Sequence, residues 1–446
     1  MPRPMKDSGI EWLGEIPAHW KLAPLKAVCS CFGRIGFRGY TQEDLVDEGE
    51  GAITLSPTNI IDSKLTLKKC SYISWNKYYE SPEIMLFKGD IVFVKTASVG
   101  KCAIYDSDEK ATVNPQFVVL KDIKCDRKFL FYTLISSVIQ SPLALSNFGS
   151  VIGTITQKQL LSYKVCIPPL DEQQRIATFL DGECARIDSV IEKTRVSVEE
   201  YKKLKQALIT RAVIKGIRPN RPMKQSGVEW LGDIPDGWDC RKLKTFSDVI
   251  SKGATPKDLV NEINDDHCIR YIKSENIVDN RLIDKPEFGI RLDTHEKELK
   301  RSQLSERDIL FVIAGASIGK TAIMRQELVP SNTNQATSFI RIKAKYIQSQ
   351  KFIWYALQSD IVKKYISLYA VQSAQPNLSM ADLGDMKIPI PPLEEQKEIA
   401  QYLDEKTAAI DSLVAKKNQL AEELTSLKKS LIFEYVTGKK EAPEKA

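Results

Sequence analysis

The sequence predicts an α+β protein in which two globular α/β domains are separated by two long helices that form an antiparallel coiled coil. Two observations favour this fold. Two sequence boxes each occur twice, in the same order, which indicates an internal duplication with pseudo-two-fold symmetry. In both halves, short β-rich runs are followed by a long stretch with the apolar spacing of a helix.

The duplication is clearest in the two boxes. Residues 5–20 read MKDSGIEWLGEIPAHW and residues 223–238 read MKQSGVEWLGDIPDGW, with 11 of 16 positions identical at an offset of 218. The second box, PPLDEQQRIATFLDGECARIDSVI at 168–191, recurs as PPLEEQKEIAQYLDEKTAAIDSLV at 391–414, with 13 of 24 positions identical at an offset of 223. A solenoid would show many repeats of about 20–50 residues, so a single large duplication indicates one scaffold that presents two different surfaces.

The interior of each half differs in sequence and has gained residues, which explains the change in offset. Short strand-like runs bounded by Gly, Pro, Asn and Asp occur at 51–56, 91–94, 117–120, 270–273, 309–313 and 338–342. A helical stretch follows in each half, at 127–140 and 348–368. Each insert is therefore predicted to be a globular α+β domain.

A long helix is predicted after the proline pair of each half. Proline suits the first turn of a helix, and the acidic residues that follow suit the positive end of the helix dipole. From Pro168 to about Val213 the only proline is Pro169 and the only glycine is Gly182. A helix of about 40 residues is roughly 60 Å long at 1.5 Å per residue.

Apolar residues recur along both helices at the spacing of a coiled coil. They are Ile176, Leu180, Ile187, Ile191, Val198, Tyr201, Leu204 and Leu208 in the first helix, and Ile399, Leu403, Ile410, Leu413, Leu420, Leu424, Leu427 and Leu431 in the second. We expect the seam to contain Leu413, Leu420 and Leu427, which are seven residues apart, with Leu424 and Leu431 offset to complete it. Because the second helix starts at the second domain, it must run back antiparallel to pair with the first, which predicts a dumbbell.

These features divide the chain into seven predicted segments. They are an N-terminal box (1–22), a first domain (23–167), a first spacer helix (168–215), the repeated box (216–240), a second domain (241–390), a second spacer helix (391–437) and a charged tail (438–446).

The composition excludes several classes of protein. With 446 residues, 43% hydrophobic and 27% charged, the chain is neither disordered, nor collagen-like, nor a small disulfide scaffold. Its 64 basic and 58 acidic residues leave a net charge of +6, which serves a polyanion only if it is concentrated in patches. Nine scattered cysteines without a Cys-x-x-Cys pair, and three histidines, predict no metal site. With neither a signal peptide nor a membrane span, we expect a cytoplasmic protein with reduced thiols.

Taken together, the duplicated motifs resemble the specificity subunit of type I restriction–modification systems. The motifs are SGIEWLGEIPAHW at 8–20 and SGVEWLGDIPDGW at 226–238, a variable region after each, and then IPPLDEQ at 167–173 and IPPLEEQ at 390–396, each opening a long helix. The resemblance covers essentially the whole chain, and two boxes that each occur twice in the family's order are too specific for a chance match.

The resemblance implies that each insert is a target recognition domain that reads one half of an asymmetric, bipartite site in double-stranded DNA. The helices would set the length of spacer DNA and dock two methyltransferase subunits for adenine-N6 methylation, and restriction–translocase subunits would add cleavage. The chain itself would be non-catalytic and bind no cofactor, because S-adenosylmethionine, ATP and Mg²⁺ would belong to the partners. Rigidly joined readers fix the half-site separation. With about 60 Å of helix and about 3.4 Å per base pair, the whole site would span at most on the order of 15–20 pairs.

Two motifs suggest other chemistry but are incomplete. Residues 315–321 (GASIGKT) resemble a phosphate-binding loop, yet its first glycine is one residue too close to Gly319, and a strand-like segment follows instead of a helix. A tight β-turn, or a turn whose lysine touches a DNA phosphate, explains it better. Residues 114–117 (NPQF) differ by one residue from the catalytic loop of amino-methyltransferases, but the duplicate reads TNQA at 333–336.

Candidate contact residues follow from chemistry, since arginine suits guanine and Asn or Gln suits adenine. For DNA we expect Arg34, Arg38, Lys95, Lys101, Gln116, Lys252, Lys273, Lys320, Gln372, Gln375 and Asn377. For docking of partner subunits we expect Trp12, Leu13, Glu172, Gln173, Trp230, Leu231, Glu395 and Gln396. Solvated surface for the first set, and packing or helix-start chemistry for the second, are the competing interpretations.

Two other functions remain open from the sequence. The chain could be a coiled-coil adaptor that joins two binding domains, in which case DNA affinity would be weak and insensitive to salt. It could also be a self-sufficient DNA methyltransferase, against which the incomplete motifs argue.

Overall fold

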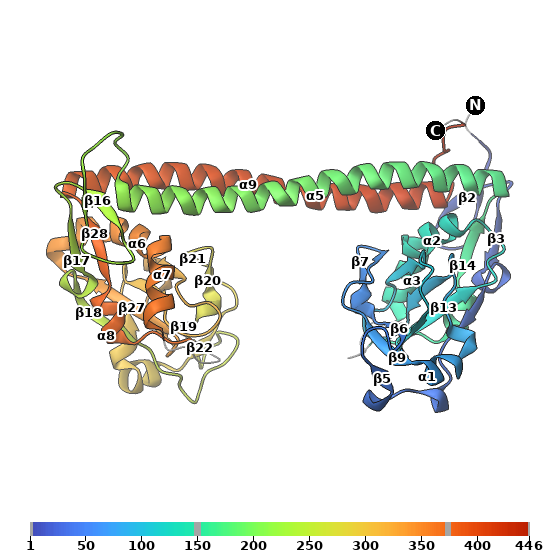
Figure 1. Ribbon diagram of the computed structural model, residues 1–446, viewed down its shortest axis with the longest axis horizontal. Helices are drawn as coiled ribbons and strands as arrows, with labels where there is room; N and C mark the ends of the chain where they lie inside the picture. Colours follow the sequence, from blue (N-terminus) through green and yellow to red (C-terminus); the bar gives the residue numbers. More distant parts are fainter. Residues whose placement is uncertain (1–2, 147–152, 371–375, 445–446) are drawn as a thin grey trace. The chain divides into compact units, whose positions relative to one another are not determined.

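The computed structural model describes residues 3–146, 153–370 and 376–444 (Figure 1). It is a mixed α/β structure that divides into two compact units, here called unit 1 and unit 2. Unit 1 comprises Met1–Thr194 and Gln419–Ala446, and unit 2 comprises Arg195–Asn418. The two long helices, α5 (Leu170–Lys215) and α9 (Leu393–Val436), therefore each supply one part to each unit.

Unit 1 holds the first divergent insert as two small sheets with flanking helices. One sheet has the strand order β11-β10-β13-β4 and the other β12-β6-β9-β5. The strands are β1 (Met5–Asp7), β2 (Glu15–Pro17), β3 (Lys21–Pro24), β4 (Ser30–Phe32), β5 (Leu45–Val46), β6 (Gly51–Leu55), β7 (Ile60–Ile61), β8 (Lys64–Leu65), β9 (Ser71–Ser74), β10 (Ile91–Val94), β11 (Cys102–Ile104), β12 (Ala111–Val113), β13 (Phe117–Lys121) and β14 (Lys164–Ile167). The helices of the insert are α1 (Trp75–Tyr79), α2 (Arg127–Ile135), α3 (Ser137–Ser146) and α4 (Gln157–Ser162).

Unit 2 holds the second insert in the same way. Its sheets have the orders β18-β27-β24-β25 and β22-β19-β26-β23. The strands are β15 (Met223–Gln225), β16 (Asp233–Pro235), β17 (Asp239–Lys242), β18 (Ser247–Lys252), β19 (Ile269–Ile272), β20 (Ile277–Val278), β21 (Arg281–Leu282), β22 (Gly289–Ile290), β23 (Gln303–Leu304), β24 (Ile309–Val312), β25 (Thr321–Ile323), β26 (Ser331–Thr333), β27 (Thr337–Ile342) and β28 (Lys387–Ile390). The helices are α6 (Gln350–Gln358), α7 (Asp360–Tyr369) and α8 (Met380–Asp385).

The predicted duplication is confirmed by the topology. The sheet β11-β10-β13-β4 of unit 1 corresponds to β25-β24-β27-β18 of unit 2, and the parallel pair β6·β12 corresponds to β19·β26. The ladder β3·β14 recurs as β17·β28. Each expected helical stretch after the sheets is two helices rather than one. They meet at Ser136 and at Ser359, whose extended backbones (ψ 164° and 161°) interrupt the helix.

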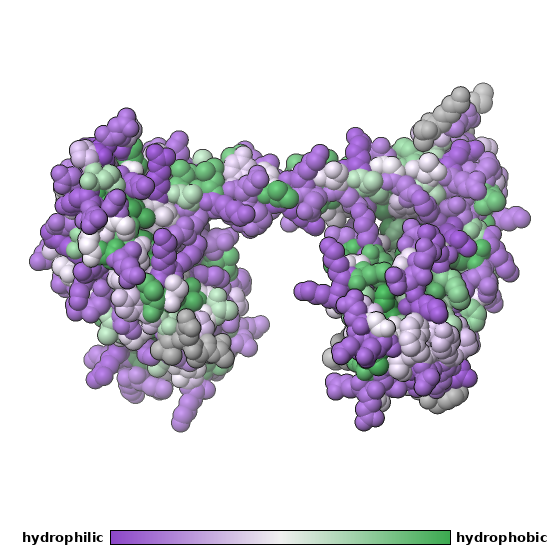
Figure 2. Space-filling model, in the orientation of Figure 1, coloured by the Kyte–Doolittle hydropathy of each residue, from purple (hydrophilic) through white to green (hydrophobic). Residues whose placement is uncertain are grey.

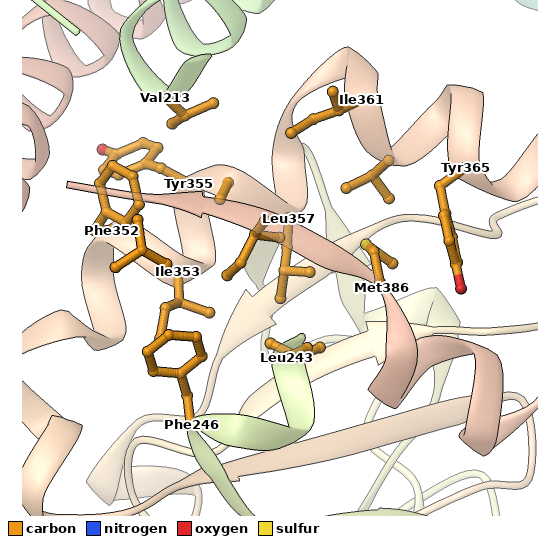
Figure 3. Close-up of a cluster of buried hydrophobic side chains, with 14 of the residues drawn as sticks. Val213, Leu243, Phe246, Phe352, Ile353, Tyr355, Leu357, Ile361, Tyr365 and Met386 are labelled. Carbon is orange, nitrogen blue, oxygen red and sulfur yellow. The ribbon is translucent and has the colours of Figure 1, made fainter. Parts of the chain in front are cut away.

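The largest hydrophobic cluster fastens the end of α5 to the insert of unit 2 (Figure 3). Val213 of α5 is buried in it together with Phe352 of α6. Leu243, which follows β17, and Met386, which precedes β28, also belong to this cluster. Burying one such side chain stabilises the fold by about 1.5–3 kcal/mol. The long helix is therefore part of the core of the unit and not a flexible connection.

The two long helices pack antiparallel within each unit (Figure 1). In unit 1, the rings of Phe179 and Tyr435 lie 4.5 Å apart, and Lys428 Nζ lies 2.6 Å from Asp188 Oδ1. A higher residue number on α5 thus pairs with a lower one on α9. The same order holds in unit 2, where Lys205 of α5 pairs with Asp411 of α9, and Arg218, just after the end of α5, pairs with Glu398. The expected antiparallel coiled coil is confirmed.

The position of the seam differs in part from the prediction. The least exposed face recurs at alternating steps of four and three residues, which is coiled-coil spacing. On α5 it is Leu180, Cys184, Ile187, Ile191, Thr194, Val198, Tyr201, Lys205, Leu208 and Ala212, and on α9 it is Leu403, Thr407, Ile410, Val414, Lys417, Ala421, Leu424, Lys428, Leu431 and Tyr435. Leu424 and Leu431 lie in the seam as expected. The assignment of Leu413, Leu420 and Leu427 to the seam is wrong, because these side chains are 41%, 43% and 53% exposed.

Candidate nucleic-acid interface

In unit 1, three turns gather at one edge of the sheet that contains β10 and β13, here called loop edge 1. They are residues 33–38, 95–101 and 114–116. The strand register brings them together, since Val94 at the end of β10 pairs with Phe117 at the start of β13. The Lys95 backbone N–H donates to the Gln116 carbonyl at 2.7 Å, so two of the turns are bonded directly.

Unit 2 has the equivalent edge, here called loop edge 2. It consists of residues 252–257, 313–320, 334–336 and 376–377. The Ile313 N–H donates to the Ala336 carbonyl at 2.8 Å, which repeats the contact of loop edge 1. Gly253 is required there, because a β-carbon at this position would lie 1.5 Å from the carbonyl oxygen of Thr333.

Both loop edges are basic and contain no acidic residue. Loop edge 1 carries four basic residues, Arg34, Arg38, Lys95 and Lys101, and loop edge 2 carries three, Lys252, Lys257 and Lys320. The turns at the opposite edge of the same sheet in unit 1 (88–90, 105–110 and 122–126) instead carry six acidic and three basic residues. The modest net charge of the chain is therefore distributed unevenly, with the positive charge on the loop edges, as a polyanion requires.

Lys101 and Lys320 occupy equivalent places at the ends of the β10–β11 and β24–β25 turns, and both are exposed. Within residues 3–146, 153–370 and 376–444, neither forms an ion pair with an acidic side chain. Lys252 is also exposed, and Lys95 and Gln116 are half-buried. The structure thus brings Lys95, Lys101 and Gln116 together at one edge, and Lys252 and Lys320 at the other.

The two arginines of loop edge 1 are engaged within the unit. Arg34 is only 8% exposed, and its guanidinium donates to the Arg38 carbonyl at 3.2 Å and lies 5.1 Å from the centre of the Tyr40 ring. Burial lowers the pKa of Arg34. Arg38 Nη1 lies 3.5 Å from a carboxylate oxygen of Glu83. Both arginines shape the loop edge, and a direct role at a base remains a prediction.

The remaining DNA candidates fall in different places. Lys273 follows β19 and its ammonium lies 3.5 Å from the centre of the Phe288 ring, so it is half-buried. Asn377 is exposed and bridges to Ala314 in loop edge 2. Gln372 and Gln375 lie outside the described residues.

The two incomplete motifs are structural turns. Gly315 and Gly319 both adopt positive φ, at 82° and 89°, in the turn between β24 and β25. Thr321 then begins β25, and its hydroxyl donates to the Leu310 carbonyl at 2.6 Å inside the sheet. The Asn114 side chain accepts a hydrogen bond from the Gln116 backbone N–H at 3.0 Å. These groups are used within the fold.

Two further residues of loop edge 2 were absent from the sequence prediction. Lys257 is exposed and basic, and the Asn334 Oδ1 atom is buried without a hydrogen-bond partner among the described residues. Asn334 follows from aligning the halves by their strands. Asn114 and Asn334 hold the same place, directly after β12 and β26. A sequence-only search at a fixed offset misses this equivalence because the interior has gained residues.

Most of the residues predicted to dock partners are buried at the start of the long helices. Glu172 accepts hydrogen bonds from Trp20 Nε1 at 2.9 Å and from Arg3 at 2.9 Å. Glu395 repeats this arrangement with Trp238, at 3.0 Å, and with Arg221. The Gln173 and Gln396 amides donate to the carbonyls of Pro168 and Pro391, each at 2.8 Å. The six predicted docking residues that are buried, each at most 8% exposed, are Leu13, Glu172, Gln173, Leu231, Glu395 and Gln396.

The surface that partners can reach lies elsewhere. Trp12 is 46% exposed, whereas Trp230 is half-buried against the rings of Tyr365 and Tyr369, 5.0 and 5.5 Å away. Hydrophobic residues are visible at the surface of the paired helices in Figure 2. The exposed apolar residues of the two helices are Leu170, Val190, Val196, Leu204, Leu393, Leu413, Leu420 and Leu427. The sequence could have indicated part of this exposed apolar set, since Leu413, Leu420 and Leu427 are seven residues apart and therefore lie on one face of α9.

The described part of the chain contains neither a cluster of metal-ligating side chains nor a single helix that could span a membrane. No group of three or more His, Cys, Asp or Glu side chains there could hold a metal ion. Eight of the nine cysteines are buried or half-buried, and Cys268 is exposed. In the same residues no single helix has the length and apolar character to cross a membrane. Only the bent pair α2–α3 reaches that threshold when combined, and most of its apolar residues lie in the core, whereas Leu145 is 69% exposed.

The chain is similar to known proteins over most of its length. Residues 58–196 and 235–422 match the family model described as type I restriction modification DNA specificity domain. The MjaVIII specificity subunit of a type I restriction enzyme from Methanocaldococcus jannaschii is 27% identical over 70% of both chains. The EcoKI specificity subunit from Escherichia coli strain K12 is 22% identical over 95% of this chain and 90% of its own.

A solved structure shares the fold. It is described as "Structural basis underlying complex assembly and conformational transition of the type I R-M system", and it superposes with a TM-score of 0.69 at 18% identity over 95% of this chain and 99% of its own. Because the family model covers both halves of the chain, the match includes both copies of the duplication. The protein therefore belongs to the type I restriction–modification DNA specificity family, as a specificity subunit.

Proposed function

We propose that this chain selects the DNA sequence for a type I restriction–modification complex by reading the two halves of an asymmetric, bipartite site. A specificity subunit is a recognition component and not a catalytic one. In this proposal each insert is a target recognition domain, and loop edges 1 and 2 are the surfaces that meet the bases. Because the two inserts differ in sequence, the two half-sites differ and the target is not a palindrome.

The basic, acid-free loop edges are the observation that carries this proposal. Lysine and arginine supply phosphate contacts, whereas polar side chains on exposed turns read base edges in the grooves. Loop edge 1 combines Lys95 and Lys101 with Gln116, and loop edge 2 combines Lys252 and Lys320 with Asn377. Each edge thus offers phosphate-binding and base-reading groups side by side.

We propose further that α5 and α9 set the distance between the half-sites. A helix of 46 residues such as α5 is about 69 Å long, which corresponds to about 20 base pairs at about 3.4 Å each. Its C-terminal end is anchored in the core of unit 2 through Val213, and its N-terminal end in unit 1 through Ile176 and Leu180. A continuous helix that is anchored at both ends is suited to keeping the distance between the two half-sites fixed.

The exposed apolar residues of the long helices suit two methyltransferase subunits. Leu413, Leu420 and Leu427 follow one face of α9 at heptad spacing. The equivalent positions on α5, at an offset of 223, are Val190, Ser197 and Leu204, of which the two apolar residues Val190 and Leu204 are 41% and 47% exposed. A partner helix packs its apolar face on such a line. Two equivalent lines accept two copies of one partner.

In this assembly the cofactors belong to other subunits. S-adenosylmethionine would be bound by the methyltransferase subunits, and ATP and Mg²⁺ by the restriction–translocase subunits. This chain supplies DNA contacts and docking surfaces only, in the cytoplasm and without a membrane.

Selection from a random library of DNA duplexes tests the proposal. The chain and its methyltransferase subunits are incubated with the library, and the bound fraction is sequenced. We expect one bipartite, non-palindromic motif with a fixed gap. Lys101→Gln or Lys320→Gln should weaken binding to all sequences and lower the slope of log affinity against log salt by about one. Lys88→Gln, at the opposite edge of the sheet, is the matched control. An enriched pool without a motif, bound in a salt-insensitive manner, would contradict the proposal.

A further inference from the structure

A hairpin of the insert touches the paired helices in unit 1 through a cluster of three charges. Asp188 of α5 accepts a hydrogen bond from Lys428 of α9 at 2.6 Å. Its second carboxylate oxygen lies 3.2 Å from the ammonium of Lys64, in the hairpin β7–β8. Lys428 is a seam residue whose side chain is 19% exposed, so its charge depends on Asp188 for compensation. One aspartate thus joins both long helices to the insert.

Unit 2 contains the same cluster with the roles of the helices exchanged. Asp411 of α9 accepts hydrogen bonds from Lys205 of α5, at 2.7 and 2.8 Å. The Arg281 guanidinium, in the hairpin β20–β21, donates to Asp411 at 2.7 Å. The seam lysines and the aspartates of the two units hold equivalent positions at an offset of 223. A cation at the hairpin position occurs in both inserts, as lysine in one and arginine in the other, although the inserts differ in sequence.

A second attachment lies one heptad earlier on each helix. Asp181 accepts a hydrogen bond from Tyr132 of α2 at 2.7 Å, and Asp404 accepts one from Tyr355 of α6 at 2.8 Å. Seven residues of helix correspond to about 10.5 Å. Two attachments separated along the helix resist rotation of the insert, which a single attachment cannot do.

The hairpin also reaches the loop edge. In unit 2, Asn280 in the β20–β21 turn accepts a hydrogen bond from the Thr321 backbone N–H at 3.1 Å, next to Lys320. In unit 1, the equivalent turn residue Ser63 lines a cavity of about 520 Å³ together with Lys101. The hairpin therefore stands between the paired helices and the surface proposed to read DNA.

We propose that Lys64 and Arg281 are positioning residues that hold each recognition domain at one orientation on the helix pair, and so narrow the range of DNA spacer lengths that the subunit accepts. This inference rests on the proposed function, because a fixed spacer is part of it. The physical reason is geometric, because a small rotation of the insert at the hairpin moves its loop edge along the DNA relative to the helix pair and so changes the spacer length that fits. Without the hairpin cation, the insert keeps the second attachment, where Lys128 and Lys351 also pair with Asp181 and Asp404, and its hydrophobic contact with the helix. It loses the support one heptad further along the helix, so that small rotations about the remaining contacts cost less free energy.

The test measures, across a genome, which DNA spacer lengths the complex accepts. Cells that express the chain with its methyltransferase subunits carry either the native sequence or Lys64→Gln combined with Arg281→Gln. Single-molecule sequencing then gives the methylated fraction at the normal spacer and at spacers one base pair longer or shorter. An exposed ion pair contributes a factor of about five at most. The double variant removes two such pairs, one in each unit, so we expect it to raise methylation at altered spacers, relative to the normal one, by up to about 25-fold.

Two control variants isolate the charge contact. Lys64→Arg keeps the cation, as the duplicate does with Arg281, and should behave as the native chain. Lys68→Gln removes an exposed cation of the segment that follows the hairpin, and should also leave the spacer ratio unchanged. Should the double variant fail to fold, raising the salt concentration on the native complex in vitro provides the second measurement. Screening of the ion pairs should then relax the spacer ratio of the native complex.

The outcomes separate this inference from the proposed function. If the native chain yields no bipartite motif, the proposed function fails and this inference fails with it. If the native chain yields a motif but the double variant keeps the same spacer ratio, the positioning role alone is overturned. Uniform loss of methylation at every spacer would also overturn it, because the clusters would then support assembly rather than discrimination.

Discussion

Replacing Glu395 with alanine removes the carboxylate that fastens the start of α9 to the repeated box of unit 2. This carboxylate accepts the Trp238 Nε1 hydrogen bond at 3.0 Å and is ion-paired with Arg221, and its side chain is 5% exposed. Removal of one partner from a buried ion pair costs about 3–5 kcal/mol. We expect the lower value, about 3 kcal/mol, because the Arg221 side chain is 20% exposed and keeps part of its hydration.

The melting temperature of unit 2 measures this cost. For a domain of about 150–250 residues, 1 kcal/mol shifts the melting temperature by about 2–4 °C, so the variant should melt about 6–12 °C lower by differential scanning calorimetry of the full chain. Glu398→Ala, one turn further along α9, is the matched control. It removes an ion pair with Arg218 whose side chains are 47% and 59% exposed, and such a pair contributes at most about 1 kcal/mol. Equal melting temperatures for the two variants would refute this reasoning.

Three further predictions concern the thiols, the charge clusters and the docking surface. Burial raises the pKa of Cys184 to about 11 and that of Cys166 to about 12, so these thiols stay protonated at pH 8. Cys268 is exposed, so Cys268→Ser should remove the fastest phase of thiol labelling by a chromogenic disulfide. Although burial alone would raise it, Lys428 and Lys64 hold the pKa of Asp188 below its ordinary value of 3.8. Its contribution to stability is present above that value and lost as the pH falls through the lower native pKa, so the destabilisation by Asp188→Asn in urea unfolding should disappear under acid conditions. Leu427→Glu, at a side chain that is 53% exposed, should leave the melting temperature unchanged but weaken methyltransferase binding more than tenfold in a titration, whereas Leu431→Glu in the seam should lower the melting temperature.

The sequence was sufficient for the arrangement of elements because the relevant signals are local or repeated. The duplicated boxes revealed the symmetry, and the proline pairs marked the starts of the long helices within two residues of Leu170 and Leu393. The turn between β24 and β25 was also predicted correctly, since a loop one residue short and a following strand pattern argued against a phosphate-binding loop.

The seam could not be assigned from hydrophobicity alone. Leu413, Leu420 and Leu427 satisfy the heptad rule, but any line of positions spaced by seven does so. The actual seam includes Lys205 and Lys428, whose charges are compensated by aspartates that flank the seam on the opposite helix. A hydrophobic line that faces solvent and a seam that contains lysine are distinguished only by the position of the partner helix.

The buried position of Glu172 could not be predicted from the sequence either. An acidic residue in the first turn of a helix is expected at the surface, where it interacts favourably with the helix dipole. Glu172 is instead buried, because it meets Trp20 and Arg3, which lie more than 150 residues earlier in the chain. Arg34 was likewise predicted as a surface cation, but its guanidinium lies within reach of the Val113 carbonyl, 79 residues later. Such distant partners leave no local signal.

Single-molecule sequencing of genomic DNA from the source cell, with and without this gene, shows whether the chain selects the DNA sequence. We predict that deletion removes N6-methyladenine from one bipartite, non-palindromic motif, whose two halves are then assigned to the two inserts by exchanging one insert. Methylation that persists unchanged at every motif in an otherwise active system would contradict the claim that this chain selects the sequence.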